Sequence, residues 1–242
     1  MRSWVGKRYW LIGASEGLGR ALAMQMSRAG AHVILSSRDG DRLESLVADL
    51  PGSAAAVPVD VTDLAAVNAV AKSIGRIDGM VYLAGAYWPM TAADWSAPQV
   101  ETMASVNFLG ALHAVGAILP HMQIRGEGHI VLTGSLSAYR GLPGAIGYGA
   151  TKAALKSLAE TMRADLKHSG ICVQLVNPGF IKTRLTDKND FRMPFIMEPD
   201  HAARLMFEHM NTNRFRRDFP WPFSAMFRIA QFIPDWLYFR LV

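Results

Sequence analysis

The chain of 242 residues is half apolar and 19% charged, a composition typical of a globular protein with one core. We therefore expect a single domain over residues 1–242. The net charge of +5 comes from scattered side chains rather than a basic block, which argues against a nucleic-acid partner. The single cysteine, Cys172, excludes an intramolecular disulfide. No signal-peptide core and no apolar run of about 18 residues stands out, so we expect a cytoplasmic protein.

Apolar segments of strand length alternate with amphipathic segments of helix length. A strand at 9–14 precedes a helix at 17–29, and one at 32–37 precedes a helix at 41–50, which Asp41 and Glu44 begin as a capping box. Further strands are predicted at 55–61, 78–85, 128–135 and within 170–179, and further helices at 63–74, 98–124, 148–168 and 199–210. The strands are apolar on both faces, so the sequence predicts a doubly wound α/β fold, a parallel sheet with helices on both faces.

The stretch IGASEGLGR, residues 12–20, places three glycines between the first strand and the first helix. Free N–H groups and the positive end of the helix dipole make such a turn an anion site, whereas a plain glycine turn is the alternative. The spacing G-x-x-x-G-x-G resembles the short-chain dehydrogenase/reductase family. The resemblance implies a Rossmann fold that binds a dinucleotide, with loop contacts from Gly13, Ser15, Glu16, Gly17, Leu18 and Gly19.

The segment SSRDG follows the second strand, where the adenosine ribose of the cofactor is expected. Ser37 and Arg38 lie there, and an arginine suits the 2′-phosphate of NADP(H), whereas a carboxylate suits NAD(H). We interpret Asp39 as a helix-start residue, so NADP(H) is favoured over NAD(H). Glu16 weakly favours the opposite, because it adds negative charge near the phosphate. A solvated surface arginine is the alternative for Arg38.

Two further loops follow the family pattern. VDVTD at 59–63 and LAGAY at 83–87 imply cofactor contacts by Asp60, Val61, Ala84 and Gly85. A helix cap is the alternative for Asp60, a role that Thr62 or Asp63 could fill equally well. Leu83 and Ile12 depart from the family, which has Asn and Thr at these positions. Both changes are from polar to apolar, so we expect these two side chains to pack against each other.

The segment YGATK opens the predicted helix at 148–168 and puts Tyr148 and Lys152 on one helix face. A phenol has a pKa near 10, and we expect the Lys152 ammonium and an oxidised nicotinamide to lower it. The resemblance implies that Tyr148 transfers a proton, that Ser135 in LTGSLSAY positions the substrate oxygen, and that Lys152 tunes Tyr148 and orients the ribose. Ser137 is a competitor for Ser135.

Asn107 in SVNFLG corresponds to the family asparagine that holds a water leading to the lysine, although a structural hydrogen bond is the alternative. NPGFIKT at 177–183 implies that the nicotinamide is bordered or held by Pro178, Gly179, Ile181 and Thr183. The family also implies a homodimer or homotetramer, paired through helices 98–124 and 148–168. The histidines lack a metal-ligand spacing, so no metal is expected.

The motifs together predict an NADP(H)-dependent oxidoreductase that moves a hydride between nicotinamide and a carbonyl or secondary alcohol. The alternative is a catalytically silent NAD(P)-binding sensor or scaffold. Within the domain, 184–242 is expected to form a substrate loop followed by an aromatic and basic tail. The loop is rich in Phe and Met, which favours an apolar or lipid-like substrate.

The tail from 211 to 242 holds nine aromatic residues and five arginines against two aspartates. Helical spacing puts one apolar set on one face, namely Phe223, Met226, Phe227, Ala230 and Ile233, and Pro234 ends this helix. Ser224, Arg228 and Gln231 are expected on the other face. The apolar face packs against the core, the pocket mouth or another copy, or else 220–242 contacts a membrane surface as a peripheral segment.

Overall fold

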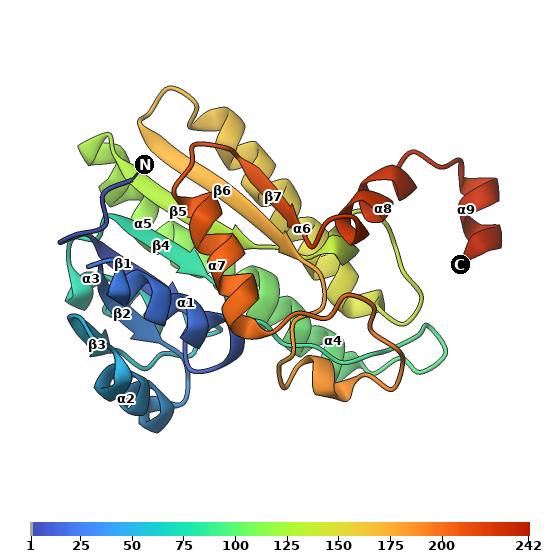
Figure 1. Cartoon of the computed structure of the whole chain (residues 1–242), viewed down its shortest axis with the longest axis horizontal. Helices are drawn as coiled ribbons and strands as arrows, with labels where there is room; N and C mark the ends of the chain where they lie inside the picture. Colours follow the sequence, from blue (N-terminus) through green and yellow to red (C-terminus); the bar gives the residue numbers. More distant parts are fainter. Residues whose placement is uncertain (1) are drawn as a thin grey trace.

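The computed structural model describes residues 2–242, which form a seven-stranded parallel sheet in the order β3-β2-β1-β4-β5-β6-β7 (Figure 1). The strands are β1 (Arg8–Ile12), β2 (His32–Ser36), β3 (Ala54–Ala56), β4 (Gly79–Tyr82), β5 (Gly128–Thr133), β6 (Ile171–Pro178) and β7 (Arg216–Phe219). The main helices are α1 (Gly17–Arg28), α2 (Gly40–Asp49), α3 (Leu64–Ile74), α4 (Ala97–Ala104), α5 (Gly110–Arg125), α6 (Ile146–Asp165), α7 (Pro199–Met210), α8 (Phe223–Ala230) and α9 (Asp235–Leu241).

Successive strand residues point to opposite faces, and each face has its own core. Leu11, Leu35 and Val81 lie in one core, under α1, α2 and α7. Their strand neighbours Ile12 and Ile34 lie in the other core, under α3, α5 and α6. The predicted doubly wound fold is confirmed.

Two strands differ from the prediction. β3 covers only Ala54–Ala56, so most of the predicted strand at 55–61 is an extended connection. β7 was not predicted, and it pairs in parallel with the end of β6, Leu175 with Arg216 and Pro178 with Phe219. β7 is an edge strand with the sequence RRDF, so it lacks the apolar pattern of strands covered on both faces.

The predicted capping box at Asp41 and Glu44 is wrong. α2 begins one residue earlier, at Gly40, and its N-cap is Asp39, whose carboxylate accepts a hydrogen bond from the Arg42 N–H at 3.1 Å. Asp39 thus satisfies one of the first amides of the helix. The interpretation of Asp39 as a helix-start residue agrees with this geometry.

The predicted helix at 98–124 has three parts: α4, a π-helical segment at Ser105–Leu109, and α5. The helical stretch Ala97–Arg125 is long and apolar enough to cross a membrane, a feature that the sequence analysis did not predict. In the fold, Ala111, Ala114 and Ile118 of this helix pack into the core against the sheet. The apolar composition of this stretch is therefore explained by its packing in the core.

The predicted tail helix is α8, but its faces differ from the prediction. Ser224 is buried together with Phe223, whereas Met226 is 63% exposed. Phe223 and Phe227 pack against Leu136 and Tyr139, whereas Met226 of the same predicted face is not covered, so apolar spacing alone did not indicate which side chains are buried. A further helix, α9, follows Pro234 and was not predicted.

Candidate active site

The predicted cofactor loops meet at the point where the strand order reverses. β1 lies between β2 and β4, so the chains leaving β1 and β4 diverge to opposite faces of the sheet. Ligands of doubly wound sheets bind in the crevice at the carboxyl ends of such strands. The glycine loop after β1 and the 83–87 loop after β4 both lie at this edge.

The glycines of the loop are required by close packing. Gly13 has φ +92°, and a Cβ there would overlap the backbone of Ala84; a Cβ at Gly19 would overlap the Gly13 carbonyl oxygen. A Cβ at Gly17 would lie 2.7 Å from the Thr183 side chain. No side chain in residues 2–242 caps α1, because Glu16 at its N-cap accepts no hydrogen bond from the first turn. These amides are available to an anionic ligand, so the loop fits a dinucleotide phosphate.

The expected packing between Ile12 and Leu83 is wrong. Ile12 belongs to the core under α3, α5 and α6, whereas Leu83 packs against the core on the opposite face. The two loops are joined by the backbone instead: the Leu83 N–H donates to the Ile12 carbonyl at 2.7 Å. The apolar side chains fill separate cores because neighbouring parallel strands put these two positions on opposite faces.

Glu16 is paired with two arginines from distant parts of the chain. Arg42 of α2 contacts its carboxylate at 3.1 Å, and Arg184, after the nicotinamide motif, contacts the same oxygen. The negative charge that we expected near the phosphate is therefore compensated. These pairs also connect the glycine loop with α2 and with the substrate loop.

The adenosine end of the crevice contains one uncommitted arginine. Arg38 is exposed and has no hydrogen bond or ion pair within residues 2–242, whereas Asp39 caps α2 and pairs with Arg42 at 3.0 Å. Asp60 accepts hydrogen bonds from the Thr62 N–H at 2.9 Å and the Thr62 hydroxyl at 2.8 Å. Burial raises the pKa of Asp60, but these bonds and Arg38 outweigh it, so the pKa lies below its usual value.

Ser37 lies beside Arg38 at the end of β2, and its hydroxyl contacts the Asp39 backbone at 3.2 Å. Val61 follows Asp60, and its carbonyl contacts His113 Nδ1 at 2.9 Å. The cap of α3 is Asp63, whose carboxylate accepts from the Ala66 N–H, so Asp60 is not the cap.

Ser135, Tyr148 and Lys152 are brought together by β5 and α6. Ser135 follows β5, and its oxygen accepts hydrogen bonds from the Ser137 N–H at 3.2 Å and the Ser137 hydroxyl at 3.0 Å. The Ser135 proton remains free to point at another acceptor. Lys152 is 3% exposed and lies one helical turn beyond Tyr148, with Nζ 5.6 Å from the centre of the phenol ring. The two hydrogen bonds from Ser137 thus hold the Ser135 hydroxyl in place.

In the chain without cofactor, the pKa of Tyr148 is raised, whereas the sequence analysis expected it to be lowered. Burial raises the pKa of Tyr148 to about 12, the Ser135 hydroxyl lowers it in part, and Tyr87 raises it further. Lys152 Nζ donates to the Thr133 carbonyl at 2.9 Å rather than to the phenol oxygen. Burial also lowers the pKa of Lys152 to about 8. Tyr148 is therefore a protonated phenol at neutral pH.

Asn107 is fully buried in the π-helical segment and connects two parts of the site. Its Oδ1 accepts from the Ala86 N–H at 2.6 Å, and its Nδ2 donates to the Ala86 carbonyl at 2.9 Å and to the Thr151 hydroxyl at 3.0 Å. The side chain thus fixes the loop containing Ala84 and Gly85 against α6. These contacts match the structural alternative, and the role through a water that leads to Lys152 stays a prediction.

The nicotinamide motif leaves β6 beside the glycine loop. The Gly179 N–H donates to the Phe219 carbonyl at 2.7 Å, which continues the β6–β7 pairing past Pro178. Ile181 is buried, and Thr183 approaches Gly17. Thr183 therefore faces the start of α1, whereas Gly179 lies against Leu136, Pro220 and Phe223.

Sequence reasoning missed residues that cover the site. The Tyr87 ring packs edge-to-face on Tyr148 with ring centres 5.0 Å apart, and its hydroxyl donates to Asn189 at 2.7 Å. Lys188 donates to the Tyr87 carbonyl at 2.7 Å and lies 3.9 Å from the centre of the Trp88 ring. The predicted substrate loop therefore holds Tyr87, the residue that packs on Tyr148. The signal was available, because Tyr87 ends the quoted LAGAY motif.

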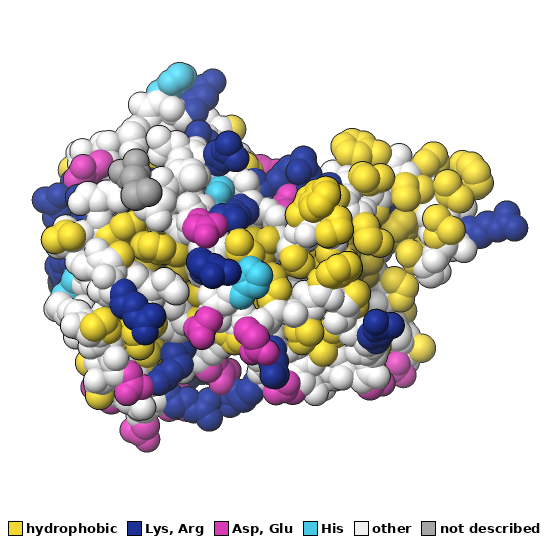
Figure 2. All heavy atoms as spheres, viewed as in Figure 1, with side chains coloured by type: hydrophobic (Ala, Val, Ile, Leu, Met, Phe, Trp, Pro, Cys, Tyr) yellow, Lys and Arg dark blue, Asp and Glu magenta, His cyan; other side chains and the backbone are white. Residues whose placement is uncertain are grey.

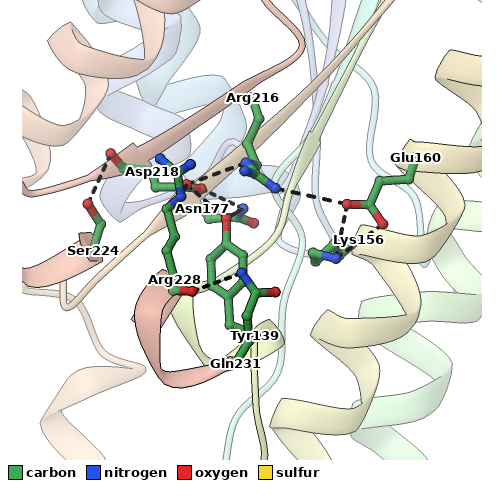
Figure 3. Close-up of polar contacts among 9 residues, drawn as sticks. All are labelled: Tyr139, Lys156, Glu160, Asn177, Arg216, Asp218, Ser224, Arg228 and Gln231. Atoms are coloured by element: carbon green, nitrogen blue, oxygen red, sulfur yellow. Dashed lines mark hydrogen bonds and ion pairs between the residues drawn. The ribbon is translucent and has the colours of Figure 1, made fainter. Parts of the chain in front are cut away.

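A buried carboxylate behind the site was also missed. Asp218 of β7 accepts hydrogen bonds from the Tyr139 hydroxyl and from Asn177 Nδ2, both at 2.8 Å (Figure 3). Arg216 and Arg228 pair with it at 3.4 and 3.8 Å. Asn177 precedes the nicotinamide turn and Arg228 lies in α8, so this cluster connects the active site with the tail. Its arginines line a cavity of about 560 Å³.

The chain's similarity to known proteins decides its family. A family model described as short chain dehydrogenase matches residues 7–192. The chain belongs to the short-chain dehydrogenase family. An uncharacterized oxidoreductase of Myxococcus xanthus (strain DK1622) is 35% identical to this short-chain dehydrogenase over 235 residues, which cover 94% of this chain and 93% of that protein. The predicted membership is confirmed, and the chain is an oxidoreductase.

Solved structures of relatives contain nicotinamide cofactors. A short-chain dehydrogenase/reductase of Burkholderia phymatum in complex with NAD is 25% identical, with TM-score 0.88 and coverage of 95% of this chain and 94% of that one. A short-chain dehydrogenase of Sphingobium yanoikuyae in complex with NADPH is 26% identical, with TM-score 0.84 and coverage of 92% and 91%. These relatives support a nicotinamide cofactor for this short-chain dehydrogenase without selecting NAD or NADP.

Proposed function

We propose that this chain is a cytoplasmic NADP(H)-dependent oxidoreductase that interconverts an apolar carbonyl compound and its secondary alcohol. The observation that carries the proposal is the grouping of Ser135, Tyr148 and Lys152 at the carboxyl edge of the sheet, beside a glycine loop with uncapped amides. When bound, the nicotinamide cofactor supplies or accepts the hydride. The loop amides hold its phosphates, and Arg38 binds the 2′-phosphate.

The side chains then divide the proton chemistry. In the reducing direction Tyr148, protonated at neutral pH, donates its proton to the substrate oxygen. The Ser135 hydroxyl keeps its proton and donates a hydrogen bond to the same oxygen, which fixes the position of that oxygen. Lys152 keeps one N–H on Thr133 and uses the others to hold the ribose. Tyr87 packs on the phenol, and Asn189 of the 184–198 loop accepts a hydrogen bond that holds the Tyr87 ring in place.

An aromatic cluster beside the nicotinamide turn supports an apolar substrate. Phe180 follows Gly179 directly, and its ring centre lies 5.9 Å from those of Phe191 and Phe223. Phe195 lies 5.6 Å from Phe223 by the same measure. Phe191 and Phe195 are about half exposed, so they offer apolar surface at the entrance. Binding becomes more favourable when a hydrocarbon chain covers this apolar surface, whereas a small polar ketone covers little of it.

The experiment that tests the substrate class is NADPH oxidation against methyl ketones of increasing chain length. We expect kcat/KM to rise with length, by up to about fourfold per added methylene where the chain contacts the cluster. Preference for short polar ketones would contradict the apolar pocket. NADPH binding without turnover of any ketone would instead support the alternative, a catalytically silent sensor or scaffold.

Arg38 provides a separate test of cofactor preference. Arg38→Asp should lower kcat/KM for NADPH by about 10–100-fold and spare NADH, because a charge-assisted contact to the 2′-phosphate is replaced by repulsion. The matched control is Arg76→Asp, which changes an exposed arginine before β4, at the opposite edge of the sheet. Steady-state rates with both cofactors measure the ratio. An unchanged ratio in Arg38→Asp would show that this side chain does not select the cofactor.

A further inference from the structure

The chain ends in an apolar arm, residues 220–242, that projects from the body of the molecule (Figure 1). Its large side chains are more than 60% exposed at seven positions: Trp221, Met226, Ile229, Phe232, Trp236, Phe239 and Leu241. Figure 2 shows hydrophobic side chains gathered over this projecting end, whereas charged side chains are spread over the rest of the same face. A contiguous exposed patch of this kind marks a contact surface.

The arm is fixed to the body, so its exposure does not come from a loose tail. Arg140 donates to the carbonyls of Ala230, at 2.7 Å, and Ile233, and pairs with Asp235 at 2.6 Å. The same guanidinium lies 3.9 Å from the centre of the Tyr238 ring. The Tyr238 hydroxyl donates to the Gly141 carbonyl. The apolar side chains are therefore presented outward by an anchored element.

The charges of the arm favour an anionic partner. Its cations Arg228 and Arg240 are exposed, and its one acid, Asp235, pairs with Arg140. Beside it, Asp218 is buried against Arg216 and Arg228. Two copies joined arm to arm would bring two surfaces with the same excess of arginine into one interface. Anionic headgroups would instead neutralise that excess.

We propose that residues 220–242 dock on the surface of an anionic lipid bilayer, with α8 and α9 lying in the plane of the interface. α8 has eight residues and α9 has seven, far fewer than the roughly 20 needed to cross a bilayer. Aromatic side chains enter the boundary between headgroups and acyl chains while arginines pair with phosphates. This docking does not depend on the proposed substrate, although Phe223 at the base of the arm touches the nicotinamide turn at Gly179.

The test is co-sedimentation of the full chain with phosphatidylcholine vesicles, with and without phosphatidylglycerol. We expect binding to the anionic vesicles that weakens with salt and falls by at least about tenfold in the double variant Phe232→Ser, Trp236→Ser. Arg240→Gln should weaken binding less. The matched control is Ile124→Ser, which alters an equally exposed side chain on α5, and it should bind like the unmodified protein. Unfolding temperatures show that each variant is folded.

Three results would overturn the proposal. They are no sedimentation of the unmodified protein, equal sedimentation of the folded double variant, or equal losses in the double variant and in Ile124→Ser. If size-exclusion chromatography with light scattering shows that the double variant dissociates an oligomer, and vesicles bind neither protein, the arm is an interface between copies. Activity is not measured in this test, so its outcome is independent of the proposed reaction.

Discussion

Replacing Tyr148 by Phe should abolish ketone reduction while leaving cofactor binding intact. The phenol lies beside Ser135, and burial raises its pKa to about 12, so it holds a proton at neutral pH that it can give to the substrate oxygen. We expect kcat to fall by about 10²–10⁴-fold, the usual contribution of a general acid. The aromatic ring remains and keeps its contact with Tyr87. Steady-state NADPH oxidation measures the loss.

Two controls separate chemistry from folding in this variant. Titration of NADPH fluorescence should give a dissociation constant within a few fold of the unmodified protein, and thermal unfolding should be unchanged. Substantial residual turnover in a folded, cofactor-binding Tyr148→Phe protein would mean that another group donates the proton. Ser135 would then be the first residue to examine, because its own proton is free.

Gly13→Ala should destabilise the protein and remove cofactor binding together. The added Cβ would overlap the Ala84 backbone, and φ +92° is strained for any L side chain. Strain and overpacking together predict a loss of about 2–4 kcal/mol in the free energy of unfolding. The glycine loop would move away from the 83–87 loop, and the amides of α1 would lose their position. Urea unfolding and NADPH titration measure the two effects.

Gly116→Ala is the matched control for this substitution. Gly116 is an exposed glycine inside α5, and a Cβ there meets no atom within 4 Å. Alanine is the better helix former, so we expect a gain of about 0.5–1 kcal/mol and unchanged cofactor binding. If Gly13→Ala were as stable as Gly116→Ala, the close contact between the two loops would not be needed for the fold.

The fold was predictable because its central strands are covered on both faces and therefore read as continuous apolar runs. β7 was not, since an edge strand made of RRDF has no such pattern. The π-helical turn at Asn107 was equally invisible, because one additional residue per turn does not interrupt a run of helix-forming residues. α9 follows Pro234, which in the sequence indicates the end of one helix but does not indicate that another helix begins.

The candidate site was predictable where the motif residues are close in sequence, as in YGATK and the glycine loop. Partners that meet only in the folded chain were not. Glu16 gains Arg42 and Arg184, and Asp218 gains Tyr139 and Asn177, all from distant segments. The raised pKa of Tyr148 in the chain without cofactor was not predictable for a related reason: the sequence shows a neighbouring ammonium but not how much water burial removes.

The most direct test of the account is the fate of a labelled hydride. The protein would be incubated with a long-chain methyl ketone and NADPH in which the transferable hydrogen at C4 is deuterium. The alcohol product would then be analysed by mass spectrometry and NMR. Deuterium on the carbinol carbon, absent with Tyr148→Phe, is the predicted result. Alcohol without deuterium there, or no alcohol from any ketone although NADPH binds, would contradict hydride transfer at this site.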